Sequence, residues 1–231
     1  MTEDEAKQWV KHKDNQNKVV QEFFKANKPT RGKIALFMAG IPGAGKTEFT
    51  QNAIQESPEL ISIEHDQLVE YIDGYKPEAY YNFRKAGSVL VTRILEECLQ
   101  HGYALVFDGT LSHENGIKNI NKCLRNGYKV IVIYIVQDTT MAWELTRARE
   151  LVKKRAIEKI GFIETCKKIN ANLLNIFKKY GANVDFSFWI INKRGQTDLS
   201  KATAIIHSAT LDRSAEIEKA LRKDYTIDIG K

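Results

Sequence analysis

The chain has 231 residues, 43% of them hydrophobic and 28% charged, which is typical of a globular protein with one large domain and excludes two full-sized enzymatic domains. No apolar run approaches the roughly 20 residues that cross a bilayer, and the charged N-terminus is unlike a secretory signal, so we expect a soluble, cytoplasmic protein without a membrane partner. The net charge of +6 indicates an anionic partner. Cys98, Cys123 and Cys166 lack the spacing of a disulfide or zinc site, and we expect them to be reduced and mostly buried.

Amphipathic and apolar segments alternate along the chain. Residues 1 to 30 are polar with apolar side chains at helical spacing, and they end near Pro29 and Gly32, which predicts an N-terminal helical extension. Apolar runs of the kind that forms strands buried on both faces of a parallel sheet follow at 34–39, 60–63, 104–107, 130–136 and 186–191. Helices are expected between and after them, at 46–57, 77–101, 113–126, 139–158 and 163–180.

This alternation of strands and helices predicts a three-layer α/β/α fold with a mostly parallel sheet of about five strands. We divide the chain into an N-terminal helical extension at 1–31, an α/β domain at 32–194 and a C-terminal appendage at 195–231. The appendage has a candidate helix at 211–223 and a short alternating segment at 225–229, and neither indicates a role.

A phosphate-binding loop follows the first predicted strand. The sequence GIPGAGKT at 40–47 matches the GxxxxGK[ST] pattern between a strand and a helix, the context that defines a P-loop. Glycines let backbone N–H groups converge on phosphate oxygens, the lysine reaches the β- and γ-phosphates, and the threonine hydroxyl binds Mg²⁺. The alternative is a glycine-rich turn that binds no nucleotide. The residues expected to bind ATP are Gly40, Ile41, Pro42, Gly43, Ala44, Gly45, Lys46, Thr47 and Glu48.

The remaining motifs favour a kinase over other P-loop proteins. The sequence NKRG at 192–195 lacks the aspartate with which GTPases read guanine. Asp108 is followed by Gly109, so the second carboxylate with which motor-type ATPases activate water is missing. A kinase needs a base near the acceptor hydroxyl and cations over the transferred phosphoryl group, and it needs no hydrolytic glutamate.

Two carboxylates come at the ends of predicted strands, on the edge where α/β proteins bind ligands. Asp66 is the candidate general base, with a helix N-cap as its alternative role, and Glu64 beside it is expected to contact the substrate. His65 lies between them and is expected to point to the opposite face as a packing residue. Asp108 and Thr110 are expected to orient substrate or Mg²⁺, with capping as the alternative for Asp108.

The positive charge is expected to be concentrated in one segment. Residues 147–155, RARELVKKR, include five basic side chains between the fourth strand and a late helix, where small P-loop kinases have a mobile lid. Arginine suits a lid because its planar, permanently charged group holds phosphoryl oxygens in the transition state. The candidates are Arg147, Arg149 and Arg155, and the alternative is a solvated basic helix face.

The ordered set GIPGAGKT, IEHD, FDGTLSH and TRARELVKKR resembles the zeta toxin family of P-loop kinases over residues 33–192. The resemblance implies a toxin, held by an antitoxin, that uses ATP and Mg²⁺ to phosphorylate the 3′-hydroxyl of a UDP-N-acetyl sugar, chiefly UDP-N-acetylglucosamine. The positions that match the family's functional residues are Lys46 and Thr47 for ATP and Mg²⁺, Asp66 for the base, Asp108 and Thr110 for the acid-Gly-Thr substrate motif, and Arg147 or Arg149 with Arg155 for the paired lid arginines.

The chain departs from the family pattern at three places. Asp108 stands where a glutamate is common, and Val69 and Ser112 stand where basic residues are frequent, so Lys76 or Lys118 would have to supply the missing charge. Two rival functions therefore stay open. One is another P-loop kinase, such as a polynucleotide 5′-hydroxyl kinase or an antibiotic phosphotransferase, although a nucleic-acid partner is not favoured. The other is a non-catalytic protein in which ATP gates partner binding.

Overall fold

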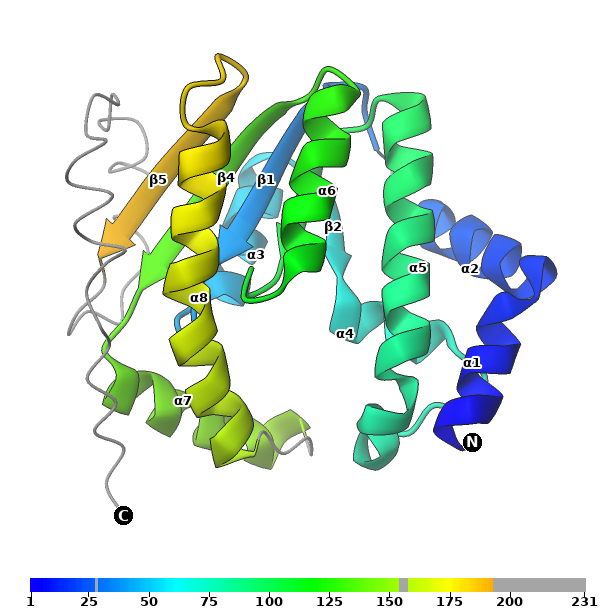
Figure 1. The fold of residues 1–231 in the computed structure, drawn as a ribbon. Coiled ribbons are helices and arrows are strands. Elements are labelled where there is room, and N and C mark those ends of the chain that lie inside the picture. Colours follow the sequence, from blue (N-terminus) through cyan, green and yellow to red (C-terminus); the bar gives the residue numbers. More distant parts are fainter. Residues whose placement is uncertain (28, 154–157, 193–231) are drawn as a thin grey trace.

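A computed structural model describes residues 1–27, 29–153 and 158–192 (Figure 1). Its strands are β1 (Ile34–Ala39), β2 (Ile61–Glu64), β3 (Leu105–Asp108), β4 (Lys129–Val136) and β5 (Phe186–Asn192). Its α-helices are α1 (Glu3–Lys11), α2 (Lys13–Ala26), α3 (Lys46–Glu56), α4 (His65–Leu68), α5 (Tyr80–His101), α6 (Glu114–Arg125), α7 (Thr139–Lys153) and α8 (Lys159–Tyr180). Two short 3-10 helices, η1 (Val69–Tyr71) and η2 (Pro77–Ala79), connect α4 to α5.

The five strands form one parallel sheet in the order β2-β3-β1-β4-β5. Helices α5, α6 and α8 cover one face and α3 covers the other, whereas α7 lies beneath the carboxyl ends of the strands (Figure 1). Because helices cover both faces, the strands are nearly continuous apolar runs, and their side chains are buried, as in the stacked rings of Phe37 and Phe107. The predicted three-layer α/β/α class is confirmed.

The strand order fixes where a ligand can bind. The central strand β1 has β3 on one side and β4 on the other, and the chain passes from one side to the other after β3. In open α/β sheets, ligands bind outside the carboxyl ends of the strands at such a switch point. The loop after β1 and the residues that follow β2 and β3 therefore meet at one edge.

The N-terminal extension is two helices, not one. The chain breaks between α1 and α2 at His12, whose ψ of 121° is extended. The buried side chains of both helices belong to the hydrophobic core, and the rings of Phe23 and Tyr71 lie edge to face at 6.4 Å. The Trp9 indole donates a hydrogen bond of 3.1 Å to Asp73. These helices therefore pack on the rest of the described chain.

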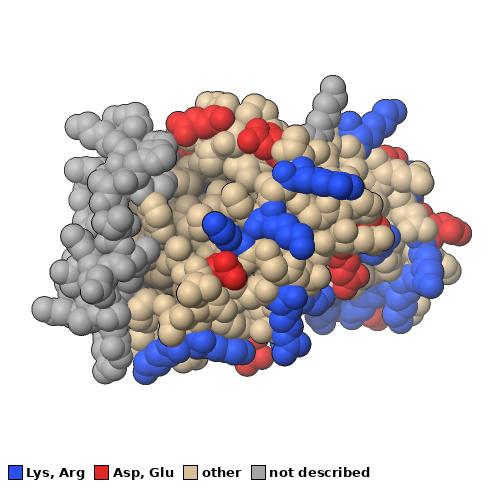
Figure 2. All heavy atoms as spheres, turned by 90° about the horizontal axis from the view of Figure 1, so that it is seen from above, with Lys and Arg blue, Asp and Glu red and all other residues tan. Residues whose placement is uncertain are grey.

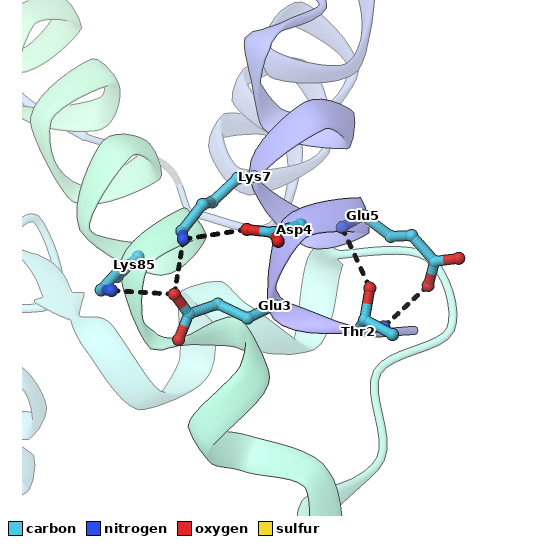
Figure 3. Close-up of polar contacts among 6 residues, drawn as sticks. All are labelled: Thr2, Glu3, Asp4, Glu5, Lys7 and Lys85. Atoms are coloured by element: carbon cyan, nitrogen blue, oxygen red, sulfur yellow. Dashed lines mark hydrogen bonds and ion pairs between the residues drawn. The ribbon is translucent and has the colours of Figure 1, made fainter.

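Helix α1 begins with a capping box (Figure 3). The Glu5 amide donates to the Thr2 hydroxyl, and the Thr2 amide donates to the Glu5 carboxylate. Glu3 accepts from Lys7 of the same helix and from Lys85 of α5, and these hydrogen bonds lower the pKa of Glu3 to about 2. The pairs are exposed to solvent, so they orient the helix more than they stabilise it.

Basic side chains are not confined to the predicted lid. Figure 2 shows the molecule from above, where the strands of Figure 1 begin, and Lys and Arg side chains are spread over this face. The last turns of α6 and α8 carry Lys122, Arg125, Lys178 and Lys179. Cations are favoured at helix C-termini, where the macrodipole is negative, so part of the net charge of +6 has a structural explanation.

Several boundaries differ from those expected. Strands β2 and β3 each run one residue further and include the acids Glu64 and Asp108, since these backbones still pair with each other. The helix expected over 77–101 starts as η2, because Pro77 has no N–H and suits the first position of a helix. The candidate helix at 211–223 and segment at 225–229 lie outside the described residues. Cys98, Cys123 and Cys166 are free and buried, as expected.

Candidate active site

The P-loop lies at the carboxyl end of β1 and leads directly into α3. Gly43 (φ 76°) and Gly45 (φ 91°) adopt backbone conformations that favour glycine, and Gly45 is the N-cap of α3. Lys46 and Thr47 are the first two residues of the helix, so they stand beside backbone N–H groups that have no partner within it. This end of a helix also carries partial positive charge, and the loop therefore suits a phosphate group.

Lys46 is the electrostatic centre of the site. Its Nζ donates a hydrogen bond of 2.9 Å to the carbonyl of Ile41 within the loop. Burial lowers the pKa of Lys46 to about 8, because it penalises the charged amine; Arg149 acts in the same direction, while Asp108, Glu48 and Asp66 oppose it. These charges come from α3, α4, β3 and α7, so the fold gathers side chains that are far apart in the sequence.

Asp108 and Glu64 end neighbouring strands and are paired in the register of the sheet. Burial raises the pKa of Asp108, and the charge of Lys46 and a hydrogen bond with the Thr47 side chain oppose this shift. Glu64 is buried, with 9% of its surface exposed, and is the N-cap residue of α4. Asp108 thus contacts the P-loop helix directly, and it is not the N-cap of the next helix, α6, because that position is His113.

Thr110 lies in a loop held against the P-loop. The Gly40 amide donates to the Thr110 carbonyl at 3.5 Å, and the hydroxyls of Thr110 and Ser112 are hydrogen-bonded at 2.7 Å. Leu111 between them has a φ of 54°, which is unusual for a residue with a branched side chain. Asn172 of α8 donates to the Leu111 carbonyl at 3.3 Å, so a distant helix helps to hold this conformation.

Asp66 is the second residue of α4 and not its N-cap, because β2 ends at Glu64. The alternative capping role is therefore wrong. The Asp66 side chain is 36% exposed, and Tyr80 donates a hydrogen bond of 2.7 Å to its Oδ1. The orientation expected for His65 was wrong, because the strand does not continue through it and its ring lies beside Asp66, with Nδ1 3.6 Å from the same oxygen.

Helix α7 brings one of the candidate lid arginines to the P-loop. Arg149 donates from Nη2 to the Thr47 hydroxyl at 3.3 Å. Arg147 instead pairs with Glu150 and lies over the ring of Trp143, 5.9 Å from its centroid. The geometry thus favours Arg149 for the role that the sequence left open between the two. Arg155 lies outside the described residues.

The side chains present suit Mg²⁺ only in part. Within residues 1–27, 29–153 and 158–192, no group of three or more His, Cys, Asp and Glu side chains is arranged to hold a metal ion. Thr47 and Asp108 are oxygen donors in mutual contact at the start of the P-loop helix. Mg²⁺ in nucleotide sites typically uses one or two protein oxygens together with phosphate oxygens and water. This pair therefore fits a metal that binds together with a nucleotide.

Val69 and Ser112, which stand where basic residues are frequent in zeta toxins, are both buried. Val69 is fully buried, and Ser112 is 4% exposed. Neither position gives a cationic side chain access to solvent.

Two cations act near this edge of the sheet. Burial lowers the pKa of His113 at the start of α6, and the charges of Lys168 on α8 and Arg84 on α5 lower it further.

A substitution at Gly43 tests the close contact between the P-loop and α7. An added Cβ would lie 2.0 Å from the Ala142 carbonyl oxygen and 2.8 Å from the Thr146 hydroxyl oxygen, at a φ of 76° that alanine adopts at a cost of about 1–2 kcal/mol. Gly43→Ala should therefore lower the free energy of unfolding by at least that amount and weaken ATP binding at least about tenfold, by displacing α7 or the loop. Denaturant unfolding and ATP titration measure both effects. Gly161→Ala is the control, since among the described residues its added Cβ meets no atom within 4 Å outside the neighbouring residues and backbone of its own helix; equal stability and affinity in the two variants would contradict the prediction.

The lowered pKa of Lys46 predicts a pH dependence of nucleotide binding. The amine is charged below pH 8 and increasingly neutral above it, so the affinity for ATP should fall as the pH rises through about 8. Calorimetric titration with ATP across this range measures the effect. Lys46→Arg keeps a permanent charge and should flatten the dependence. An affinity in the unchanged protein that does not fall above pH 8 would contradict the prediction.

The fold and the loop define a P-loop α/β protein with the three-layer architecture of P-loop kinases. The family model for the zeta toxin matches residues 18–203, and the chain belongs to the zeta toxin family. A search of curated proteins found no match. Among the described residues, no helix is long and apolar enough to span a membrane.

Solved structures show the same fold at low sequence identity. One is from the work on the PezAT chromosomal toxin-antitoxin system of Streptococcus pneumoniae, with a TM-score of 0.62 and 15% identity, covering 92% of this chain and 96% of that chain. Another is a complex of AvrRxo1-ORF1 and AvrRxo1-ORF2 with sulphate ions, with a TM-score of 0.54 and 14% identity, covering 95% and 84% of the respective chains. The corresponding complex with ATP gives a TM-score of 0.52 and 13% identity, with coverage of 95% and 84%.

Proposed function

We propose that this chain is an ATP- and Mg²⁺-dependent kinase that transfers the γ-phosphoryl group of ATP to a hydroxyl of a small acceptor. The observation that carries the proposal is that the P-loop with Lys46, Asp66 after β2, and Asp108 at the end of β3 lie at the carboxyl ends of the strands, where Arg149 of α7 donates a hydrogen bond to Thr47. Phosphoryl transfer depends mainly on positioning and on stabilising the charge of the transferred group. A cationic loop, a carboxylate that can bind metal and a separate carboxylate for the acceptor meet these needs.

Each side chain has a proposed role in this reaction. Lys46 binds the β- and γ-phosphates, while Thr47 and Asp108 hold Mg²⁺, which neutralises phosphate charge. Asp66 accepts the proton of the acceptor hydroxyl as its oxygen attacks the γ-phosphorus and the bond to the bridging oxygen breaks, leaving ADP. The other proposed participants are Arg149 and Arg155 over the transferred group, Glu48 near the nucleotide, and Glu64 and Thr110 around the acceptor.

The proposed acceptor is a UDP-N-acetyl sugar, phosphorylated at its 3′-hydroxyl, because the chain belongs to the zeta toxin family. Its diphosphate needs cations that Val69 and Ser112 do not supply. Arg84 and Lys168 are exposed, and their charges act at His113, at the same edge of the sheet as Asp66. We propose these two side chains, in place of Lys76 or Lys118, as the partners of the diphosphate.

The proposed domain division keeps the kinase at 32–194, with 1–31 and 195–231 as appendages. A protein antitoxin is the proposed macromolecular partner, supported by the family and by the solved structure from the PezAT toxin-antitoxin system. Coexpression of the chain with a candidate antitoxin, followed by copurification, tests that part. Toxicity is a separate question, and growth of cells that express the chain without an antitoxin measures it.

Incubation with labelled ATP, Mg²⁺ and a panel of acceptors tests the proposed function. The panel contains UDP-N-acetylglucosamine, other UDP-sugars, nucleosides and 5′-hydroxyl oligonucleotides, and the product is identified by mass spectrometry. A phosphorylated UDP-N-acetyl sugar is expected. Arg84→Gln should raise the KM for this acceptor and leave the KM for ATP unchanged. Phosphorylation of another acceptor alone would exclude the sugar, and a chain that binds ATP but phosphorylates none would exclude the kinase.

A further inference from the structure

Tyr80, which lies outside the recognised motifs, and His65 form a hydrogen-bonded group with Asp66. The Tyr80 hydroxyl donates to Asp66 Oδ1 at 2.7 Å and lies 3.3 Å from His65 Nδ1. Tyr80 is 8% exposed and is the first residue of α5, while His65 is the first residue of α4. The group therefore joins two helices at the position of the proposed base.

The His65 ring is held by the backbone of α5. Its Nε2 lies 2.9 Å from the Arg84 carbonyl oxygen, which can only accept, so Nε2 carries a hydrogen and Nδ1 of the neutral ring is an acceptor. Gly87 makes room for the ring, since an added Cβ there would lie 2.9 Å from Nε2 and 2.4 Å from the Val69 side chain. A glycine inside a helix costs about 1 kcal/mol relative to alanine, and this close packing gives it a purpose.

We propose that Tyr80 is a positioning residue for Asp66, and that His65 is the second hydrogen-bond acceptor that allows Tyr80 to serve both protonation states of the base. The inference rests on the proposed function, in which Asp66 takes a proton from the acceptor. Before transfer, the phenol donates to the charged carboxylate and fixes its orientation. After transfer, Asp66 carries the proton of the acceptor hydroxyl on Oδ1 and donates it in a hydrogen bond to the phenol oxygen. The phenol hydrogen then turns to His65 Nδ1. The group of Asp66, Tyr80 and His65 thus holds one more proton, the one that the acceptor lost.

Other charged groups also act on this part of the site. Lys46 and Glu48 come from α3 and Asp108 from β3, and both Lys46 and Asp108 interact electrostatically with Asp66. On the α5 side, Arg84 contacts His65 through its backbone carbonyl. Replacing the Tyr80 hydroxyl leaves all of these groups in place. A change in the titration of Asp66 on such a replacement therefore reports the hydrogen bond itself.

Carbon-13 NMR titration of the aspartate carboxyls in the full chain tests the role of Tyr80 without any acceptor, with Asp66→Asn used to assign the signal. Tyr80→Phe should raise the pKa of Asp66 by about 1, because the hydrogen bond to the charged form is lost. Incorporating 3-fluorotyrosine in place of Tyr80 keeps the side-chain shape and makes the phenol a stronger donor, so it should lower the pKa. Tyr180→Phe is the matched control, since its hydroxyl contacts Asn121 at 3.5 Å. An Asp66 pKa that neither replacement moves would overturn the proposal.

Steady-state kinetics test the proposed role of His65, once the panel of acceptors described above has identified a substrate. Above the pH at which an imidazole is charged, Tyr80→Phe and His65→Gln should each lower kcat about tenfold or more, while the KM for ATP stays near that of the unchanged chain. An unchanged kcat in His65→Gln would overturn the role of His65. If the unchanged chain phosphorylates no acceptor, the proposed function fails, whereas the NMR titration still decides whether Tyr80 positions Asp66.

Discussion

Lys46→Ala should reduce phosphoryl transfer by at least about 100- to 1000-fold, the loss that follows removal of one fixed group that stabilises transition-state charge. Among the described residues the amine donates a hydrogen bond to the Ile41 carbonyl, and its charge interacts with carboxylates on α3, α4 and β3. In a nucleotide complex the same amine would face the β- and γ-phosphates. Without it, the negative charge that shifts onto the β–γ bridging oxygen has no lysine partner.

The Lys46→Ala protein should stay folded, because alanine is a good helix former and suits the first position of α3. Circular dichroism and the unfolding midpoint check this point. Lys122→Ala is a matched control: Lys122 lies in the last turn of α6 and pairs with Glu96 on the surface, so its loss should leave turnover unchanged. Near-normal transfer by folded Lys46→Ala would show that the loop is not the site of the reaction.

Asp66→Asn should reduce kcat by about 100- to 10,000-fold, with much less change in the affinity for ATP. Asparagine keeps the size of the side chain and can still accept the hydrogen bond from Tyr80, but it cannot take the proton of an acceptor hydroxyl. Asp66 is also 36% exposed, which allows contact with a diffusible acceptor. A loss confined to kcat would therefore separate proton transfer from folding and nucleotide binding.

Single-turnover kinetics with saturating ATP, combined with calorimetric ATP titration, measures the two effects of Asp66→Asn separately. Asp185→Asn is the control, because it makes the same chemical change at an exposed position before β5, at the opposite edge of the sheet. Near-normal turnover in folded Asp66→Asn would mean that another group, or water, accepts the proton. An equal loss of ATP affinity would instead assign Asp66 to the nucleotide site.

The parts of the fold that depend on local pattern were predictable. Apolar runs bounded by turns gave all five strands within about one residue, since a strand covered on both faces must be apolar throughout. The order β2-β3-β1-β4-β5 was not predicted, because strand pairing depends on contacts between distant segments. The break at His12 was also missed, since the apolar spacing on its two sides is helical and no proline or glycine marks it.

The candidate site also has features that the sequence predicts and features that it does not. The P-loop, Asp66 and Asp108 could be placed near one another because carboxyl ends of parallel strands share an edge. The orientation of His65 was predicted wrongly, because it depended on the residue at which β2 ends. Tyr80 was missed, since it lies 14 positions from Asp66 and is brought there only by the packing of α5. Leu111 gave no signal either, because a positive φ outside glycine is imposed by its surroundings.

The most direct test of a kinase at this site is to measure ADP and phosphorylated acceptor together, in the presence of ATP, Mg²⁺ and UDP-N-acetylglucosamine or whichever acceptor the panel identifies. The account predicts one phosphorylated acceptor for each ADP, a requirement for Mg²⁺, and loss of both products in Lys46→Ala and Asp66→Asn. ADP formed at the same rate with and without every acceptor, or ATP bound and never consumed, would contradict it.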